Sequence, residues 1–448
     1  MIRITRTLKY FSIYFVIVFS ILSKAQTTDS LFSSNLYPFV VDSISITGNE
    51  ITESFIILRE LNFQIGDTLT RSNAIYNRER VYSLGIFNRV FFNPSIIDSV
   101  KILNIEVDES WYIYPVPFIE AKESDLKKLS YGVYLRLKNF RGRNEDLTAA
   151  IALGYDPTFI LSYYNPNLEY RNNLFFRTNF SYSDVTNKSL IAEKLNGANF
   201  TQKFVGMNLL VGKRLDLFNR IYALVGYNYI ETPFYIPGVN ASDDRIDNLV
   251  ELAIGYEHDT RDLAQFPQNG IFSSINYNFR GLGVDGISYS IGRIDFREYR
   301  KIFNNLISKW RFSSRLAFGN DVPFYDYSII GIDEKVRGHL SKKIEGKEYY
   351  FGSVEFYYPI IEELNIDLTF IPIIPDQLLT YRVGFYTQIF AETAIARFED
   401  QPFAINRFNS GYGIGLTFLV LPYQVFRVEV AFNEKLESQL VLDLGISF

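Results

Sequence analysis

Apolar and polar residues follow two different patterns along this chain, and the change occurs near Trp111. Before it, apolar residues recur at helical spacing between short strand-like runs, as in Phe55, Ile56, Leu58 and Leu61. After it, short alternating segments separated by turn-forming residues continue to the last residue. Side chains alternate across a strand, so each later segment has one polar face and one apolar face. The pattern predicts a small α+β domain followed by a large all-β domain.

The first part, residues 39–110, predicts a compact domain in the order strand, helix, helix, strand, strand. Thr52 is expected as the N-cap of the first helix and Thr70 as that of the second. The last two strands are expected near residues 86–92 and 100–107. Helices can cover one face of such a three-stranded sheet, and we expect the strand at 100–107 to lie at its edge.

The second part, residues 111–448, contains about 16 alternating segments, most of them about 9–15 residues long. A tilted strand of this length crosses a membrane, so we predict a 16-stranded antiparallel transmembrane β-barrel, an all-β membrane fold. An even number of strands returns the C-terminus to the side of the N-terminal domain. The segments are 117–122, 131–140, 147–155, 158–165, 174–183, 200–213, 220–231, 246–258, 271–281, 288–302, 306–320, 349–360, 379–393, 409–422, 424–433 and 438–448.

One face of nearly every segment is charged and the other is apolar. In segment 288–302, for example, Arg293, Asp295 and Arg297 share a face. Charges are costly in lipid, so we predict that the charged face lines the lumen and that the apolar face meets the membrane. A large soluble β-sandwich or jelly roll is the alternative, but it would need a dry interior face, and here the mostly apolar face is rich in aromatic residues.

The connections alternate between tight and long. Tight connections occur at 215–219, 304–305 and 421–423, and long ones at 184–199, 232–245, 321–348 and 394–408. Short periplasmic turns and long outer loops are typical of outer-membrane barrels. The connection at 361–378 breaks this pattern, because it should be a short turn and is long. An extended hairpin would fit its length, but the sequence gives no reason for one.

Composition agrees with a barrel that faces lipid and narrows the chemistry. Aromatic residues make up 17% of the chain, with 40 Phe and 32 Tyr but two Trp, as expected for strands with aromatic girdles. The net charge of −5 without a basic stripe argues against nucleic acid as a partner. The chain has no cysteine and two histidines, His258 and His339, which disfavours disulfides, thiolate nucleophiles and metal sites, and we expect no cofactor.

Residues 1–25 have the features of an export signal. Three basic residues precede an apolar run at 10–22, and residues 23–25 supply small side chains for cleavage. The run is too short to span a bilayer, which needs about 20 residues. An uncleaved anchor is the alternative. Residues 26–38 then form a short linker to the α+β domain.

Five short motifs lie in residues 39–110 at a shared spacing. They are Ile46-Thr47-Gly48-Asn49, Arg59-Glu60-Leu61, Gly66-Asp67, Arg78-Glu79-Arg80 and Leu84-Gly85-Ile86-Phe87-Asn88-Arg89-Val90. Together they resemble a POTRA domain, the periplasmic unit of the BamA-type outer-membrane assembly and translocation superfamily. One copy is present here, whereas better-known relatives carry two, three or five.

The all-β part carries further motifs that resemble this superfamily. They are Asn139-Phe140-Arg141-Gly142-Arg143 in an early strand, Tyr163-Tyr164-Asn165-Pro166 at a strand end, Asp259, Arg261 and Asp262 with Pro267 and Gly270 in a turn, and Gly411, Gly413 and Gly415 before Pro422. Val336-Arg337-Gly338 resembles the motif of loop six, here about 321–348, with His339 where relatives usually carry Phe or Tyr. The alternating Leu442, Leu444, Ile446 and Phe448 resemble the C-terminal signal by which such barrels are themselves inserted.

The resemblance implies roles for particular residues. The loop-six arginine of the family lies inside the barrel against acidic residues, so Arg337 is expected to contact Glu355 and Glu392. A guanidinium binds carboxylates in a bidentate fork and can hold the loop as a plug or brace, either for stability or for gating. Asp259, Arg261 and Asp262 are expected to form a charged periplasmic turn held by ion pairs, and an acid–base cluster is the alternative. We expect no enzyme, because no nucleophile, base and orienting group come together in the sequence.

The resemblance also implies a function. A protein of this type inserts proteins into the outer membrane of a Gram-negative bacterium, or translocates them across it, with its POTRA domain in the periplasm. Its partners would be outer-membrane lipid and unfolded client proteins, with periplasmic chaperones or lipoproteins as candidates at the POTRA domain. A passive channel, a surface receptor, and a secretion partner for one dedicated substrate are the alternatives, since fold does not settle function.

Two features are expected to carry that function. Pro115 and Pro117 lie in the weakly patterned first strand, and proline removes a ladder donor, so the seam between the first and last strands is expected to be labile. An opened seam, or the edge of the POTRA sheet, could then template a client strand.

Overall fold

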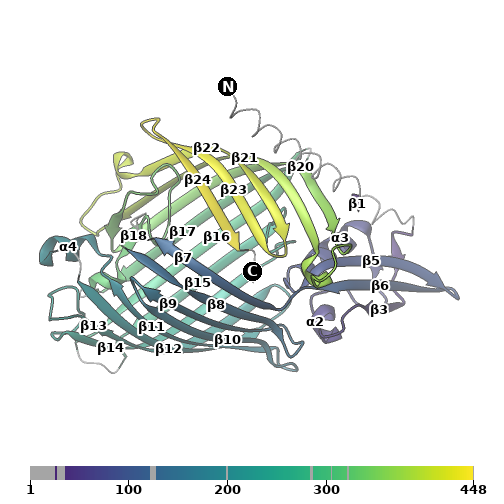
Figure 1. Ribbon diagram of the computed structural model, residues 1–448, viewed down its shortest axis with the longest axis horizontal. Coiled ribbons are helices and arrows are strands. Elements are labelled where there is room, and N and C mark those ends of the chain that lie inside the picture. Colours follow the sequence, from purple (N-terminus) through teal and green to yellow (C-terminus); the bar gives the residue numbers. More distant parts are fainter. Residues whose placement is uncertain are drawn as a thin grey trace.

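The computed structural model describes residues 26–27, 36–121, 128–197, 200–282, 286–303, 305–319 and 322–446. The expected export signal and Phe448 lie outside these residues. A small domain sits at one mouth of a wide barrel (Figure 1), and β1 (Gln26–Thr27) pairs with Leu364 and Asn365 of the barrel. No helix in the described ranges has the length and apolar character needed to cross a membrane.

The N-terminal domain has a three-stranded sheet with two helices. Its strands are β3 (Ser43–Thr47), β5 (Phe87–Ile97) and β6 (Val100–Glu109), its helices are α2 (Ser54–Leu58) and α3 (Arg71–Tyr82), and a small ribbon pairs β2 (Phe39–Val40) with β4 (Thr68–Leu69). Apolar side chains from both helices and all three strands form the core, including Ile56, Val81, Phe92, Leu103 and Ile105. The strand and helix order is the one the sequence predicts.

Two details of this domain differ from the sequence prediction. The strand near 100–107 was expected at an edge, but β6 is the central strand, with order β3-β6-β5. The tight turn at Asp98 and Ser99, both at positive φ, folds β6 against β5, and the free side of β6 then accepts β3 in parallel. Thr52 does not cap α2, whose N-cap is Glu53, because its hydroxyl bonds to Glu109 Oε1 at 2.5 Å.

Thr70 caps α3 as predicted, and its side chain accepts a hydrogen bond from the backbone nitrogen of Asn73 at 3.2 Å. The cap satisfies one of the donors that the first helical turn leaves unpaired. It also fixes where α3 begins, and this helix carries the Arg78-Glu79-Arg80 motif.

The barrel is one antiparallel sheet of sixteen strands. The short strand β1 adds a seventeenth to the same sheet but is not part of the barrel wall. The wall closes where β24 neighbours β7. The strands are β7 (Ile113–Ala121), β8 (Leu129–Phe140), β9 (Glu145–Gly154), β10 (Thr158–Glu169), β11 (Leu174–Thr186), β12 (Thr201–Arg214), β13 (Asn219–Glu231), β14 (Ile246–Asp259), β15 (Gly270–Arg280), β16 (Tyr289–Phe303), β17 (Leu306–Phe318), β20 (Glu348–Asp367), β21 (Thr380–Arg397), β22 (Asn409–Leu421), β23 (Gln424–Asn433) and β24 (Ser438–Ile446).

The two faces of the wall differ as alternation requires. Ile254 and Leu442 are 66% and 64% exposed on the outer face, whereas Glu355 on the inner face is 4% exposed. Aromatic side chains such as Trp310 and Phe312 also point outwards. An apolar, aromatic outside around a charged inside is the arrangement of a barrel in lipid.

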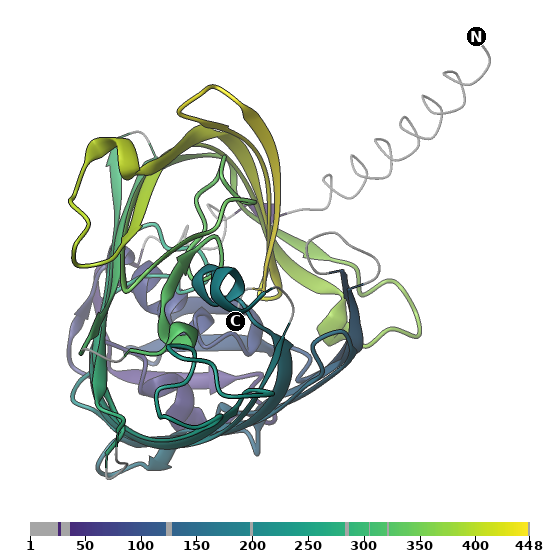
Figure 2. The ribbon, with the colours of Figure 1, turned by 90° about the vertical axis from the view of Figure 1, so that its left-hand side faces the viewer.

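The long connections carry small elements of their own. The connection after β11 holds α4 (Leu190–Asn196), and that after β21 holds η5 (Ile405–Arg407). The connection between β17 and β20 holds η3 (Phe324–Asp326), β18 (Ser328–Ile330) and β19 (Ile344–Gly346), and Figure 2 shows this segment crossing the interior of the barrel.

The connection at 361–378, which was expected to be a short turn, is part of an extended hairpin. β20 continues to Asp367 and β21 begins at Thr380, and these two residues pair with each other. The unpaired connection is therefore 368–379, which contains η4 (Asp376–Leu378).

Candidate functional site

Loop six folds into the lumen and packs on the inner face of the wall. Val336 is 1% exposed and belongs to an apolar cluster with Ile330 of β18, Phe351 of β20 and Ala394 of β21. This apolar contact brings the loop backbone against β22, where a Cβ on Gly411 would lie 1.7 Å from the carbonyl oxygen of Arg337. Glycine at this position therefore lets the loop approach the wall closely.

Arg337 lies at the centre of three carboxylates. Its Nη2 is 2.6 Å from Oε2 of Glu392 and 3.3 Å from Oε1 of Glu355, and its Nη1 is 2.8 Å from Oε1 of Glu429. The guanidinium also lies over the ring of Phe390, 3.5 Å from its centroid. A buried charge is tolerated when it is paired in this way. One side chain of loop six thus joins β20, β21 and β23.

The structure brings Arg337 together with both glutamates named from the sequence, and it adds Glu429. Glu429 alternates with Arg427 on the polar face of β23, so the sequence placed it on the lumen side, but only the strand register sets it beside Arg337. Lys309 of β17 also binds Glu355, at 2.8 Å. The cluster therefore has two cations for three carboxylates.

The rest of the loop-six motif is also engaged. Gly338 has φ +90°, a conformation in which other residues are strained. His339 Nε2 is 2.6 Å from Oε2 of Glu434, which lies in the connection between β23 and β24. Loop six is therefore tied to the C-terminal end of the wall by several different contacts.

The turn motif after β14 is structural in its contacts. Arg261 Nη2 lies 2.7 Å from Asp259 Oδ2. The carboxylate of Asp262 accepts hydrogen bonds from the backbone nitrogens of Leu263, Gln268 and Asn269, at 2.8, 3.0 and 3.1 Å. Burial raises the pKa of Asp262, and these backbone donors oppose the rise. The motif shapes the turn that faces the N-terminal domain.

Of the C-terminal signal residues, Leu442 lies exposed on the outer face of β24. Leu444 and Ile446 lie in the same strand. Among the described residues, no group of His, Cys, Asp or Glu is arranged to hold a metal ion.

A buried ion cluster joins the N-terminal domain to β20 and β21. Arg382 Nη1 is 2.6 Å from Glu79 Oε2, and its Nη2 is 3.1 Å from Glu363 Oε2. Arg78 contacts Glu79 and lies 2.9 Å from Glu363. Burial raises the pKa of Glu79, but Arg382 and Arg78 outweigh it and lower that pKa to about 2. Two cations and two anions are thus shared between the domain and the barrel.

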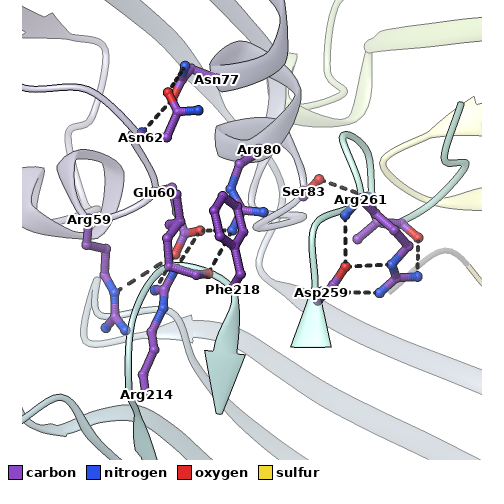
Figure 3. A network of polar contacts seen from close by, with 12 residues as sticks. Arg59, Glu60, Asn62, Asn77, Arg80, Ser83, Arg214, Phe218, Asp259 and Arg261 are labelled. Carbon is purple, nitrogen blue, oxygen red and sulfur yellow. Dashed lines mark hydrogen bonds and ion pairs between the residues drawn. The ribbon is translucent and has the colours of Figure 1, made fainter. Parts of the chain in front are cut away.

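A second ion cluster lies nearby (Figure 3). Glu60 binds Nη1 of Arg214 at 2.7 Å and Nη2 of Arg80 at 3.0 Å. Arg80 also lies over the ring of Phe218 in the turn after β12. Burial raises the pKa of Glu60, but Arg214 and Arg80 outweigh this effect and hold the pKa below its usual value. Residues of both Arg-Glu motifs therefore bind the barrel, a role that their spacing in the sequence did not reveal.

Apolar packing continues across the same junction. Tyr82 and Ile86 share one buried cluster with Leu263, Phe266 and Tyr386 of the barrel. The Phe266 and Tyr386 ring centroids are 4.6 Å apart. A cavity of about 250 Å³ remains between the domain and the barrel, lined in part by Arg59, Arg80, Arg214, Arg220 and Arg261.

The wall closes between its first and last strands. β24 and β7 are neighbours in the sheet. In the view along the barrel, the yellow strand β24 bends from the wall towards the interior (Figure 2). Tyr114 of β7 and Tyr423, in the turn before β23, approach each other with ring centroids 6.1 Å apart.

The comparisons with known proteins agree with this architecture. Residues 139–448 match the model of the Omp85 superfamily domain, and residues 39–110 match the POTRA model described as surface antigen variable number repeat. BamA from Haemophilus ducreyi, crystallised without POTRA domains 1–3, is 17% identical, with a TM-score of 0.52 over 91% of this chain and 83% of that one. CdiB from Escherichia coli is 11% identical, with a TM-score of 0.55 over 91% of this chain and 75% of that one.

Proposed function

Because this chain belongs to the Omp85 superfamily of non-enzymatic outer-membrane assembly and translocation proteins, with a POTRA domain on the periplasmic side, we propose that it receives unfolded clients at the POTRA domain and delivers them to the β7–β24 seam. Energy comes from the folding and burial of the client. The division at residues 110 and 111 into a client-binding domain and a barrel belongs to the same proposal.

The observation that carries this proposal is the brace formed by Arg337. It ties loop six to β20, β21 and β23, which stiffens that side of the wall. β24 lies on the other side of β23 and carries none of the three carboxylates that bind Arg337, although Leu340 of loop six donates to its Gln439 at 3.3 Å. A wall that is rigid up to β23 and then bends inwards favours opening at the seam, where an exposed strand edge can pair with a client strand.

Among the described residues, the β3 edge of the POTRA sheet pairs with no strand other than β6, which leaves it open for client capture. The β5 edge is engaged near its start, where Asn88 and Arg89 bind the β20–β21 hairpin. β3 forms the opposite edge of the sheet. We therefore place the client at β3, where an extended segment can add by β-augmentation, and not at the central strand β6.

The test is depletion of the protein followed by measurement of folded, heat-modifiable barrels across the outer-membrane proteome. A broad fall is expected, and replacement by the Arg337→Ala variant should reproduce part of it. Loss of a single exported protein would instead identify a translocator for one dedicated substrate. If no barrel or exported protein changes, the assembly proposal is wrong and a channel or receptor is left.

A further inference from the structure

The hairpin between β20 and β21 extends past the neighbouring wall. β20 pairs with β17 only as far as Tyr357 opposite Ile307, yet it continues to Asp367 in pairing with β21. Several other turns on this side of the barrel are tight, such as Phe303 to Leu306, although the connection between β14 and β15 is also long. The extension is therefore a local feature that barrel closure does not require.

The base of this hairpin is held firmly. Asn88 Nδ2 donates to the carbonyl oxygen of Gln377 at 2.6 Å and to Oγ1 of Thr380 at 2.9 Å. The hydroxyl of Tyr423 donates to the same carbonyl at 2.9 Å, and Arg89 binds Asp367 at 3.1 Å. These contacts fix the direction in which the tip points.

The tip presents apolar side chains to its surroundings. Phe370, Ile373 and Ile374 are 69%, 100% and 44% exposed. Asp376 is the one charged residue of the segment 368–379. Ile373 has φ +83°, a backbone conformation that is rare and costly for a β-branched residue. Full exposure and a strained backbone at Ile373 make the tip a surface that another molecule can cover.

The position of the tip indicates what it contacts. Viewed along the barrel, the light green hairpin projects sideways beyond the wall (Figure 2), and in Figure 1 it ends close to the level where the strands reach the POTRA domain. At the same end of the barrel, Ile302, Phe303 and Trp310 are 54%, 69% and 52% exposed. These side chains extend the lipid-facing surface to the periplasmic rim, so the tip lies where the bilayer surface meets the barrel.

We propose that the tip of the β20–β21 hairpin inserts into the periplasmic leaflet of the outer membrane beside the barrel, with Phe370, Ile373 and Ile374 as the inserted side chains. The occupant is lipid because the apolar tip continues the lipid-facing surface of the barrel, carries little charge and points away from the lumen. Because Asn88 and Arg89 bind the base of the hairpin, the inserted tip also sets the POTRA domain against the membrane surface. The inference depends on the outer-membrane location and not on any client.

The chain has no cysteine, so single labels can be placed at will. Ile373→Cys carries an environment-sensitive fluorophore, and the full-length protein is reconstituted into vesicles with and without brominated phospholipid. Ile254→Cys on the outer face of β14 marks full lipid exposure, and Ile97→Cys, 57% exposed on β5, marks an apolar site on the POTRA domain. We expect the Ile373 label to be quenched by brominated lipid, to an extent close to that of the Ile254 label. Quenching no greater than at Ile97 would overturn the proposal.

A second measurement separates lipid from protein as the occupant. Phe370→Ser with Ile374→Ser in the Ile373→Cys background should reduce the quenching while heat-modifiability of the barrel stays unchanged, because these side chains are exposed. An unfolded barrel polypeptide is then added to the singly labelled protein. If emission from the Ile373 label responds to that polypeptide and not to brominated lipid, the tip binds client and the proposal is wrong.

Discussion

At the scale of single residues, Arg337 makes three ion pairs, more than any other described residue of loop six. Three carboxylates surround it, and Lys309 helps to neutralise them. Removing one partner of a buried ion pair leaves uncompensated charge, which typically costs about 3–5 kcal/mol. Arg337 and the apolar contact of Val336 hold this part of loop six, and the ion pair of Glu334 with Arg311 at 2.6 Å adds a contact to β17.

Arg337→Ala is therefore expected to release loop six from the wall. Lys335 and Lys342 should then become sites for trypsin in reconstituted protein, and the rate of cleavage is the measurement. Arg337→Lys serves as the control, because it keeps the charge but loses the fork, and it should give intermediate protection. A loop that stays as resistant in Arg337→Ala as in the parent protein would refute the brace.

Gly411 offers a test of the same contact from the wall side. Gly411→Ala would set a Cβ 1.7 Å from the carbonyl oxygen of Arg337, so the loop backbone must move away. The matched control is Gly352→Ala on β20, where a Cβ would meet nothing within 4 Å. We expect trypsin to cut loop six faster in the first variant only, and equal rates in the two variants would contradict the close approach.

At the scale of elements, α3 connects the POTRA domain to β21 through Glu79 and Arg382. The pKa of Glu79 is lowered from 4.5 to about 2, so its ionised form stabilises the docked state. That contribution is fully present above pH 4.5 and is lost as the pH falls towards about 2.

Docking of the POTRA domain should consequently weaken in acid over this window. Hydrogen exchange of the α3 amides, followed as a function of pH and corrected for intrinsic rates, measures the change. Glu79→Gln should exchange faster at neutral pH and show a flatter profile, since the titrating group is gone. A parent profile as flat as that of Glu79→Gln would argue against the ion cluster as the source of stability.

The sequence predicted the individual strands and helices better than it predicted how they contact one another. Strict alternation predicted the barrel strands because a lipid-facing surface and a charged lumen both impose a period of two. The position of β6 escaped this reasoning, since edge and centre are decided by pairing between distant segments. The hairpin to Asp367 was visible only as an overlong connection, because Asn88 and Arg89, which bind its base, lie far from it in the sequence.

At the scale of the whole molecule, the POTRA domain is fixed to the barrel by two ion clusters and an apolar contact. The sequence could place Arg337 with Glu355 and Glu392 through resemblance and parity. It could not show that Glu60 and Glu79 bind Arg214 and Arg382, because these partners are joined only when the domain docks. Interfaces between domains leave no periodic signal in a sequence.

Combined Arg214→Ala and Arg382→Ala substitutions should release the POTRA domain without unfolding either part. Spin labels on Ile97→Cys and a barrel strand report the distance distribution, which we expect to broaden. Arg300→Ala removes an exposed pair with Glu298 and is the control. An unchanged distribution in the double variant would mean that apolar packing alone holds the domain.

The arginine brace also sets an order for the folding of this protein. All three of its carboxylates, Glu355, Glu392 and Glu429, come after Arg337 in the chain. Arg337 is therefore synthesised and exported before any of these three carboxylates, and the last of them arrives only when β23 is in place. Completion of the arginine brace thus marks a late step in this protein's own folding, reached when nearly the whole wall has formed.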